Sequence, residues 1–216
     1  MTSETLRITE IFYSLQGETR TSGLPTVFIR LTGCPLRCNW CDTEYAFHGG
    51  ERMTLDAIVA EVRRHQARYV TVTGGEPLAQ PNCVPLLHRL ADEGFEVSLE
   101  TSGALSLADV DPRVVKVMDL KAPGSGEVSR NLYENISYLD AKDQVKFVIA
   151  DRTDYEWSVS KLIEYQLEQR VSDVLFSPVA NVLKPERLAQ WILNDHLNVR
   201  FQLQLHRIIW GDKAGV

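Results

Sequence analysis

The sequence lacks several features that would place it in common protein classes. No apolar run approaches the roughly 18 residues that a membrane-spanning helix needs. The first residues contain neither the basic nor the apolar segment of a secretory signal peptide. Basic residues are also in the minority, because 23 Lys and Arg stand against 29 Asp and Glu, giving a net charge of −6. Since nucleic-acid-binding surfaces need clustered Lys and Arg, we expect a protein that binds neither membranes nor nucleic acid.

Cysteine is scarce, and its placement does not resemble a disulfide framework. The chain has four cysteines in 216 residues, and three of them fall within the eight residues Cys34–Cys41. Secreted domains instead carry cysteines spread along the chain in pairs. We therefore expect a cytoplasmic protein. No low-complexity linker or internal repeat interrupts the sequence, which predicts a single domain over residues 1–216.

Short β-branched runs alternate along the chain with segments of helical period, as in a mainly parallel α/β sheet with right-handed crossovers. Six or seven strands are expected, at Thr26–Leu31, Tyr69–Thr73, Phe95–Glu100, Val114–Leu120, Gln144–Ile149, Asp173–Ser177 and Val199–Leu205. Helices are expected after Thr54, which can act as an N-cap, and over Asn82–Glu93, Tyr155–Glu168 and Pro185–Asp195, with Gly94 ending the second. The tail after Leu205 is too short to predict a further element.

Glycine-rich and polar segments follow five of these strands. They are the cysteine loop, TGGEP, ETSG, DLKAPGSG and SPVAN. Binding sites of parallel α/β proteins lie at the carboxyl ends of the strands. We therefore expect all five segments to converge on one site.

The spacing Cys34-x-x-x-Cys38-x-x-Cys41 predicts a metal centre, because thiolates suit zinc and iron–sulfur clusters. A structural zinc site normally completes four ligands, and no second pair of Cys or His stands at ligand spacing here. Three thiolates can instead bind three irons of a 4Fe–4S cubane and leave the fourth iron open to a small chelating ligand. A zinc loop or buried structural thiols remain the alternatives. Cys83 lies in a helical run and is expected to be a buried apolar residue.

The cysteine motif, with the aromatic Trp40 before its last cysteine, resembles that of the radical S-adenosylmethionine (SAM) superfamily, and Gly74–Glu76 resembles the GGE motif of those enzymes. A narrower resemblance is to the 7-carboxy-7-deazaguanine synthase family. It covers nearly the whole chain and is carried by FYSLQGE (12–18), VFIRL (27–31), CDTEY (41–45) and LQLH (203–206). The resemblance implies a partial TIM-like barrel.

The resemblance also implies an activity, the conversion of 6-carboxy-5,6,7,8-tetrahydropterin to 7-carboxy-7-deazaguanine and ammonia on the route to queuosine. SAM would bind the open iron and act as a catalytic cofactor: a deoxyadenosyl radical removes hydrogen from the substrate, the ring rearranges, hydrogen returns, and ammonia is eliminated. The protein's part would be to hold and orient cofactor and substrate. A pterin substrate, an electron donor such as flavodoxin or ferredoxin, and a homodimer are the implied partners.

Residue roles follow from the same resemblance. The cluster would take Cys34, Cys38 and Cys41, and Mg²⁺ would take Thr43. SAM would meet Trp40, Asp42, Gly75, Glu76, Ser102, Asp119, Lys121 and Ser177. The substrate would meet Leu15, Gln16, Gly17, Arg30, Thr73, His206 and the terminal carboxylate of Val216. Arg30 suits a substrate carboxylate because guanidinium pairs with it bidentately.

Each of these positions also has an ordinary structural alternative. Arg30 could lie on the surface, residues 15–17 could form a simple turn, and Val216 could be a frayed end. A glycyl-radical enzyme activase shares the cysteine spacing and the short chain, and is the alternative function. Its substrate is a large protein, whereas the LQGE and CDTEY segments favour a pterin.

Overall fold

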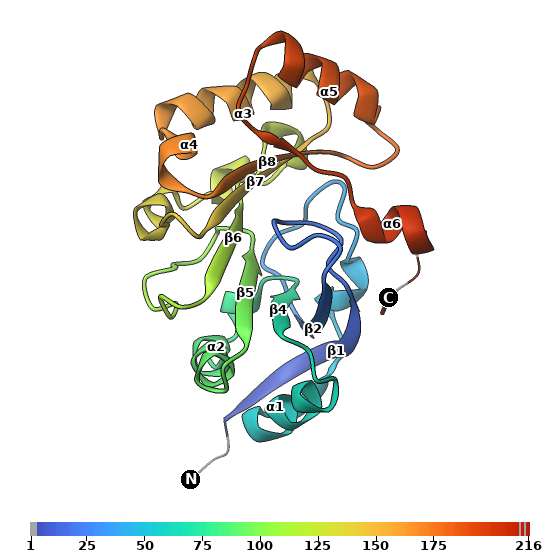
Figure 1. Ribbon diagram of the computed structural model, residues 1–216, viewed down its shortest axis with the longest axis vertical. Helices are drawn as coiled ribbons and strands as arrows, with labels where there is room; N and C mark the ends of the chain where they lie inside the picture. Colours follow the sequence, from blue (N-terminus) through green and yellow to red (C-terminus); the bar gives the residue numbers. More distant parts are fainter. Residues whose placement is uncertain (1–3, 212, 214) are drawn as a thin grey trace.

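The computed structural model describes residues 4–211, 213, 215 and 216. Seven strands run parallel to one another: β2 (Pro25–Leu31), β4 (Tyr69–Gly74), β5 (Glu96–Thr101), β6 (Val115–Asp119), β7 (Gln144–Ile149), β8 (Asp173–Pro178) and β9 (Arg200–Phe201). These correspond to the seven strands expected from the sequence. They curve into an open, partial barrel (Figure 1), which confirms the predicted fold class.

Two antiparallel strands extend one edge of this sheet, and the sequence patterns missed both. β1 (Thr5–Leu15) pairs with β2, and β3 (Glu51–Thr54) pairs with β1. Within the described residues the nine strands follow the order β3-β1-β2-β4-β5-β6-β7-β8-β9. β1 escaped detection because its register shifts between Ile8 and Glu10, which breaks the period-2 alternation of buried side chains.

The helices lie on the outer face of the sheet (Figure 1). They are α1 (Leu55–Arg64), α2 (Cys83–Asp92), α3 (Arg152–Glu164), α4 (Leu167–Arg170) and α5 (Pro185–Asn194), with short 3-10 turns at Glu44–Phe47, Pro77–Ala79, Pro123–Ser125, Val128–Arg130 and Tyr133–Tyr138. The Thr54 hydroxyl accepts a hydrogen bond from Ala57 N at 3.2 Å, which confirms the predicted N-cap. Gly94 has φ +84° directly after α2, which confirms the predicted helix end.

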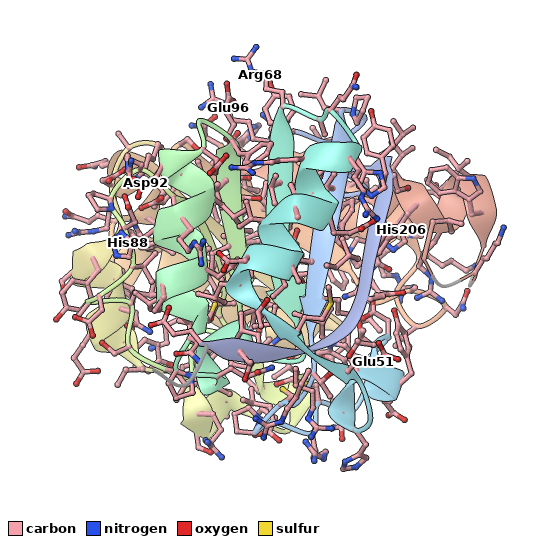
Figure 2. All side chains as sticks on the ribbon, turned by 90° about the horizontal axis from the view of Figure 1, so that it is seen from below. Glu51, Arg68, His88, Asp92, Glu96 and His206 are labelled. Carbon is pink, nitrogen blue, oxygen red and sulfur yellow. The ribbon has the colours of Figure 1, made fainter. Side chains whose placement is uncertain are left out.

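Alternation along each parallel strand separates the core from the concave face of the sheet. Val27, Ile29 and Leu31 of β2 are fully buried beneath the helices, whereas Phe28 and Arg30 point to the concave face. Figure 2 shows α1 and α2 side by side across the outer face, with Arg68 and Glu96 together where β4 and β5 begin. One hydrophobic cluster contains buried residues from β1 through α5. The single-domain expectation remains a prediction.

Three expectations about secondary structure were wrong. The last strand is only two residues long, and the tail forms a further helix, α6 (Leu205–Trp210), where none was expected. The helix predicted over Tyr155–Glu168 is divided into α3 and α4, because Gln166 adopts the left-handed conformation with φ 50°. None of the helices in the described part of the chain is both long and apolar enough to span a membrane.

Candidate active site

A cavity of about 650 Å³ opens at the carboxyl ends of the parallel strands. Every residue that the sequence assigned to the site, apart from Glu76, lines it: Leu15, Gln16, Gly17, Arg30, Cys34, Cys38, Trp40, Cys41, Asp42, Thr43, Thr73, Gly75, Ser102, Asp119, Lys121, Ser177, His206 and Val216. The fold therefore brings together residues from both ends of the chain, as the expected convergence of strand-end segments requires.

The cysteine loop leaves β2 and presents Cys34, Cys38 and Cys41 to this cavity. Burial raises the pKa of each thiol, and the nearby Lys121 ammonium opposes that rise. A metal binds the thiolate form, so the lysine charge favours ligation. Cys83 lies apart from the cavity, fully buried in α2, and its burial raises its thiol pKa strongly.

The cysteine loop offers three thiols that line one cavity. A structural zinc site normally completes four protein ligands. A 4Fe–4S cubane can take thiolates on three of its irons, each thiolate bound to a different iron. The chemistry of this donor set therefore fits a 4Fe–4S cluster with three protein ligands.

The glycines after β4 allow the cysteine loop to lie directly against that strand end. A Cβ on Gly75 would stand 2.1 Å from the Gly33 carbonyl oxygen, and Glu76 N donates to the same oxygen at 2.9 Å. Only a residue without a side chain permits this approach. The position of Gly75 therefore couples the second motif to the loop that carries Cys34.

Glu76 lies outside the cavity lining and joins two strand ends. Its side chain is fully buried, and its carboxylate accepts hydrogen bonds from Thr101 Oγ1 at 3.0 Å, Ser102 N at 2.7 Å and Ser102 Oγ at 2.5 Å. These bonds tie the end of β4 to the end of β5. Contact between this carboxylate and SAM remains a prediction, since Glu76 does not line the cavity.

Two residues that line the cavity each carry a buried polar atom without a hydrogen-bond partner among the described residues. Asp119 Oδ1 and Ser177 Oγ are inaccessible to water and make no hydrogen bond to a described residue. The other carboxylate oxygen of Asp119 accepts from Lys121 Nζ at 2.8 Å. Because leaving a buried polar atom unpaired is costly, these atoms suit a ligand that supplies hydrogen-bonding groups, such as the hydroxyl and amino groups of SAM.

A half-buried carboxylate that the sequence analysis missed lies among the expected substrate residues. Glu100 on β5 accepts from Gln16 Nε2 at 3.2 Å and from Thr73 Oγ1 at 3.1 Å. Burial, with the negative charge of Glu18, raises its pKa, although Lys146 opposes the rise. The signal was present in the sequence: Glu100 follows Leu99 on an alternating strand whose apolar residues face the helices.

The cavity floor also holds an ion pair that the sequence did not reveal. Lys146 on β7 hydrogen-bonds to Glu18, which lies far away in the sequence just after β1. Burial alone would lower the pKa of Lys146, but the carboxylates of Glu18, Asp119 and Glu100 raise it above its ordinary value. The lysine is therefore cationic. Together with Glu18 and Glu100, it lines the cavity with side chains of positive and negative charge.

The C-terminal segment closes one side of the cavity. Leu205 N donates to Gly17 O at 2.8 Å, and Gln204 Nε2 donates to Asp42 Oδ2 at 2.9 Å. Thr43 Oγ1 donates to the other oxygen of Asp42 at 2.7 Å. α6 thereby lies beside the loops after β1 and β2, and Figure 2 places His206 on that side of the molecule.

An open α/β barrel with a three-thiol loop at its mouth defines a radical SAM enzyme, and the family model described as the Radical SAM superfamily matches residues 28–119. Within that superfamily the chain belongs to the 7-carboxy-7-deazaguanine synthase family. The synthase of Koribacter versatilis is 45% identical over 95% of this chain and 97% of its own length. The synthase of Chlorobaculum tepidum is 43% identical over 99% of this chain and 98% of its own length.

A solved structure agrees with this assignment. The crystal structure of QueE from Escherichia coli superposes with a TM-score of 0.77 at 25% identity, covering 94% of this chain and 95% of that one. Membership confirms the enzyme class predicted from the cysteine loop, together with its cofactors, a 4Fe–4S cluster and SAM. The relatives carry the synthase name, not that of a glycyl-radical activase.

Proposed function

We propose that this enzyme converts 6-carboxy-5,6,7,8-tetrahydropterin to 7-carboxy-7-deazaguanine with loss of ammonia, a lyase reaction on the route to queuosine. The observation that supports it most directly is one cavity lined by the three cluster thiols, the Gly75 backbone and Arg30. A radical source and a guanidinium suited to a carboxylate thus share one space. The names of the relatives supply the product.

The residues opposite the cysteine loop suit a pterin. The ring carries amino and N–H donors beside a carbonyl, and the backbone of residues 15–17 with the Gln16 amide can pair with such an edge. Thr73, His206 and the carboxylate of Val216 line the same cavity and complete the proposed substrate site. A terminal carboxylate gives charge-assisted hydrogen bonds, which are stronger than neutral ones.

On the cofactor side, Cys34, Cys38 and Cys41 would hold the cluster, and the bound cluster and SAM would supply the radical that removes hydrogen from the substrate. Trp40, Asp42, Gly75, Ser102, Asp119, Lys121 and Ser177 are the proposed SAM contacts that reach the cavity, and Glu76 would support them from below. Asp119 and Ser177 are the firmest of these on structural grounds, because their unpartnered atoms require hydrogen-bond partners.

Mg²⁺ is proposed beside the substrate, with the Thr43 hydroxyl as a ligand. Mg²⁺ prefers oxygen ligands and keeps several waters, so few protein groups are needed. Thr43 lines the cavity, and its oxygen retains lone pairs while its hydrogen is donated to Asp42. A flavodoxin or ferredoxin donor, a homodimer and a cytoplasmic location complete the proposal.

The deciding experiment is an anaerobic assay of the reconstituted protein with 6-carboxytetrahydropterin, SAM, Mg²⁺ and a reductant. The expected result is 7-carboxy-7-deazaguanine and ammonia, many turnovers for each SAM consumed, and no accumulation of 5′-deoxyadenosine. Iron and sulfide analysis of the same sample shows whether the cluster is present. A fully loaded protein that leaves the pterin unchanged would overturn the proposal.

A further inference from the structure

Three residues that the expected site does not include surround the guanidinium of Arg30: Glu10, Tyr45 and Phe12. Glu10 Oε1 accepts from Arg30 Nε at 2.7 Å and from the Tyr45 hydroxyl at 2.9 Å. The Arg30 guanidinium carbon also lies 5.9 Å from the centre of the Tyr45 ring and 5.8 Å from that of Phe12. A carboxylate, a hydroxyl and two aromatic rings therefore fix one guanidinium.

A β-bulge puts Glu10 in this place. Ile8 lies opposite Leu31, but Glu10 lies opposite Arg30, so Thr9 is an extra residue on β1. Before the bulge, Leu6 and Ile8 are buried in the core; after it, Phe12 lines the cavity. Without the extra residue, period-2 alternation would turn Glu10 toward the helices. The bulge thus reverses the face that Glu10 occupies.

The hydrogen bond to Glu10 decides which edge of Arg30 remains available. Glu10 takes Nε, and no described residue accepts a hydrogen bond from the two Nη groups. The two Nη groups together form the edge of the guanidinium that can bind a carboxylate through two parallel hydrogen bonds. Glu10 is not among the residues lining the cavity, so it acts through the two lining residues that it holds, Arg30 and Tyr45.

Tyr45 supports the same carboxylate oxygen that holds Arg30. Its hydroxyl donates to Glu10 Oε1, and its side chain lines the cavity. Burial alone would lower the pKa of Arg30, but the hydrogen bond to Glu10 raises it, so the guanidinium is cationic.

We propose that Glu10 and Tyr45 are positioning residues for the substrate carboxylate: they orient Arg30 through Nε and leave its Nη edge facing the cavity. This role rests on the proposed function, because it takes the carboxylate at the reacting carbon of the pterin as the partner of Arg30. It predicts that both residues set affinity for that carboxylate, and that Glu10, which does not line the cavity, has no direct contact with the ring.

The test compares Glu10→Ala and Tyr45→Phe with the wild-type holoenzyme, using two probes. The first probe is 6-carboxytetrahydropterin, and the second is tetrahydropterin without the carboxylate. Losing a charge-assisted hydrogen bond of this kind weakens binding by roughly tenfold to a hundredfold, so Glu10→Ala should raise KM for the carboxylated pterin by that factor. kcat should change far less, and the Kd of tetrahydropterin, measured without reductant, should stay the same. Tyr45→Phe keeps its ring and should show a smaller rise.

Three controls separate positioning from folding. Glu93→Ala removes a carboxylate that pairs with Arg63 on the surface, and it should leave both probes unaffected. Cluster absorbance and circular dichroism should match the wild type in every variant. In an Arg30→Lys background, Glu10→Ala should add little to the loss of affinity, because the effects of substitutions at contacting residues are not additive.

Unchanged KM for the carboxylated pterin in Glu10→Ala, with wild-type turnover intact, would overturn the positioning role alone. An equal loss for both pterins would also overturn it, because it would show a general disturbance of the cavity. A loaded wild-type enzyme that neither binds nor converts the carboxylated pterin would overturn the proposed function first, and the positioning role with it.

Discussion

The imidazole of His206 lies directly against the backbone of Gly17, although the two residues come from opposite ends of the chain. A Cβ on Gly17 would stand 2.1 Å from His206 Nδ1 and 2.8 Å from its Cγ. The backbone hydrogen bond from Leu205 N to Gly17 O holds this contact in place. The space above Gly17 is therefore filled by the ring of a residue that lines the same cavity.

Gly17→Ala should displace His206 and weaken pterin binding by roughly tenfold, equivalent to about 1.4 kcal/mol. The measurement is the substrate Kd of the unreduced holoenzyme. If the alanine acts through His206, the same substitution in a His206→Ala background should have little further effect. Equal losses in the two backgrounds would show that the Gly17 backbone itself is what the substrate needs.

Cys34→Ala, Cys38→Ala and Cys41→Ala should each abolish cluster assembly and activity, because each leaves one iron without its thiolate. Iron and sulfide content after anaerobic reconstitution is the measurement. Cys83→Ala is the matched control: it should keep the cluster and lose only about 1 kcal/mol of stability through a small cavity in the core. Loss of the cluster in the Cys83 variant would mean that the fourth thiol has been misassigned.

Gly75→Ala should impair cluster assembly even though it removes no ligand. The new methyl group would collide with the Gly33 carbonyl and with Cys34 Cβ, at 2.1 and 2.8 Å, and so push the cysteine loop away from β4. Iron content per chain and the visible absorbance of the cluster report the effect. Gly94→Ala provides a control, because its left-handed backbone should cost about 1 kcal/mol without disturbing the cluster.

Mg²⁺ should raise turnover, and Thr43→Ala should lower the apparent affinity for this activation by roughly tenfold while iron content is unchanged. The substituted residue loses its oxygen ligand and its hydrogen bond to Asp42. Titration of activity with Mg²⁺ in metal-free buffer measures the response. Identical titration curves for the two proteins would remove Thr43 from the magnesium site.

Glu100→Gln should stabilise the protein increasingly as the pH rises. Burial raises the pKa of Glu100, so the folded state binds its proton more strongly than the unfolded state, in which the pKa is about 4.3. The wild type therefore loses stability as the pH rises from that value through the raised one, and the uncharged Gln avoids this loss. Anaerobic thermal midpoints at several pH values test the sign.

A Glu100→Gln variant that is instead destabilised increasingly toward high pH would show that the pairing of Glu100 with the Lys146 charge outweighs its desolvation.

The sequence by itself determined the cysteine loop, the seven parallel strands and the convergence of their ends. Ligand spacing within eight residues is local information, and a parallel sheet brings the carboxyl ends of its strands to one edge whatever its side chains are. The helix start at Thr54 and the helix end at Gly94 could also be predicted from the sequence, because both depend on the conformation and hydrogen bonding of adjacent residues.

Only the tertiary structure decided which polar side chains meet in the cavity. Lys146 on β7 pairs with Glu18 in the segment after β1, and Arg30 on β2 pairs with Glu10 on β1. The second pair depends on strand register, which an extra residue on β1 shifts by one. α6 likewise formed where the sequence predicted no element, beside residues far away in the chain. Local patterns carry the period of each strand, but packing of the whole sheet sets which residues lie opposite one another.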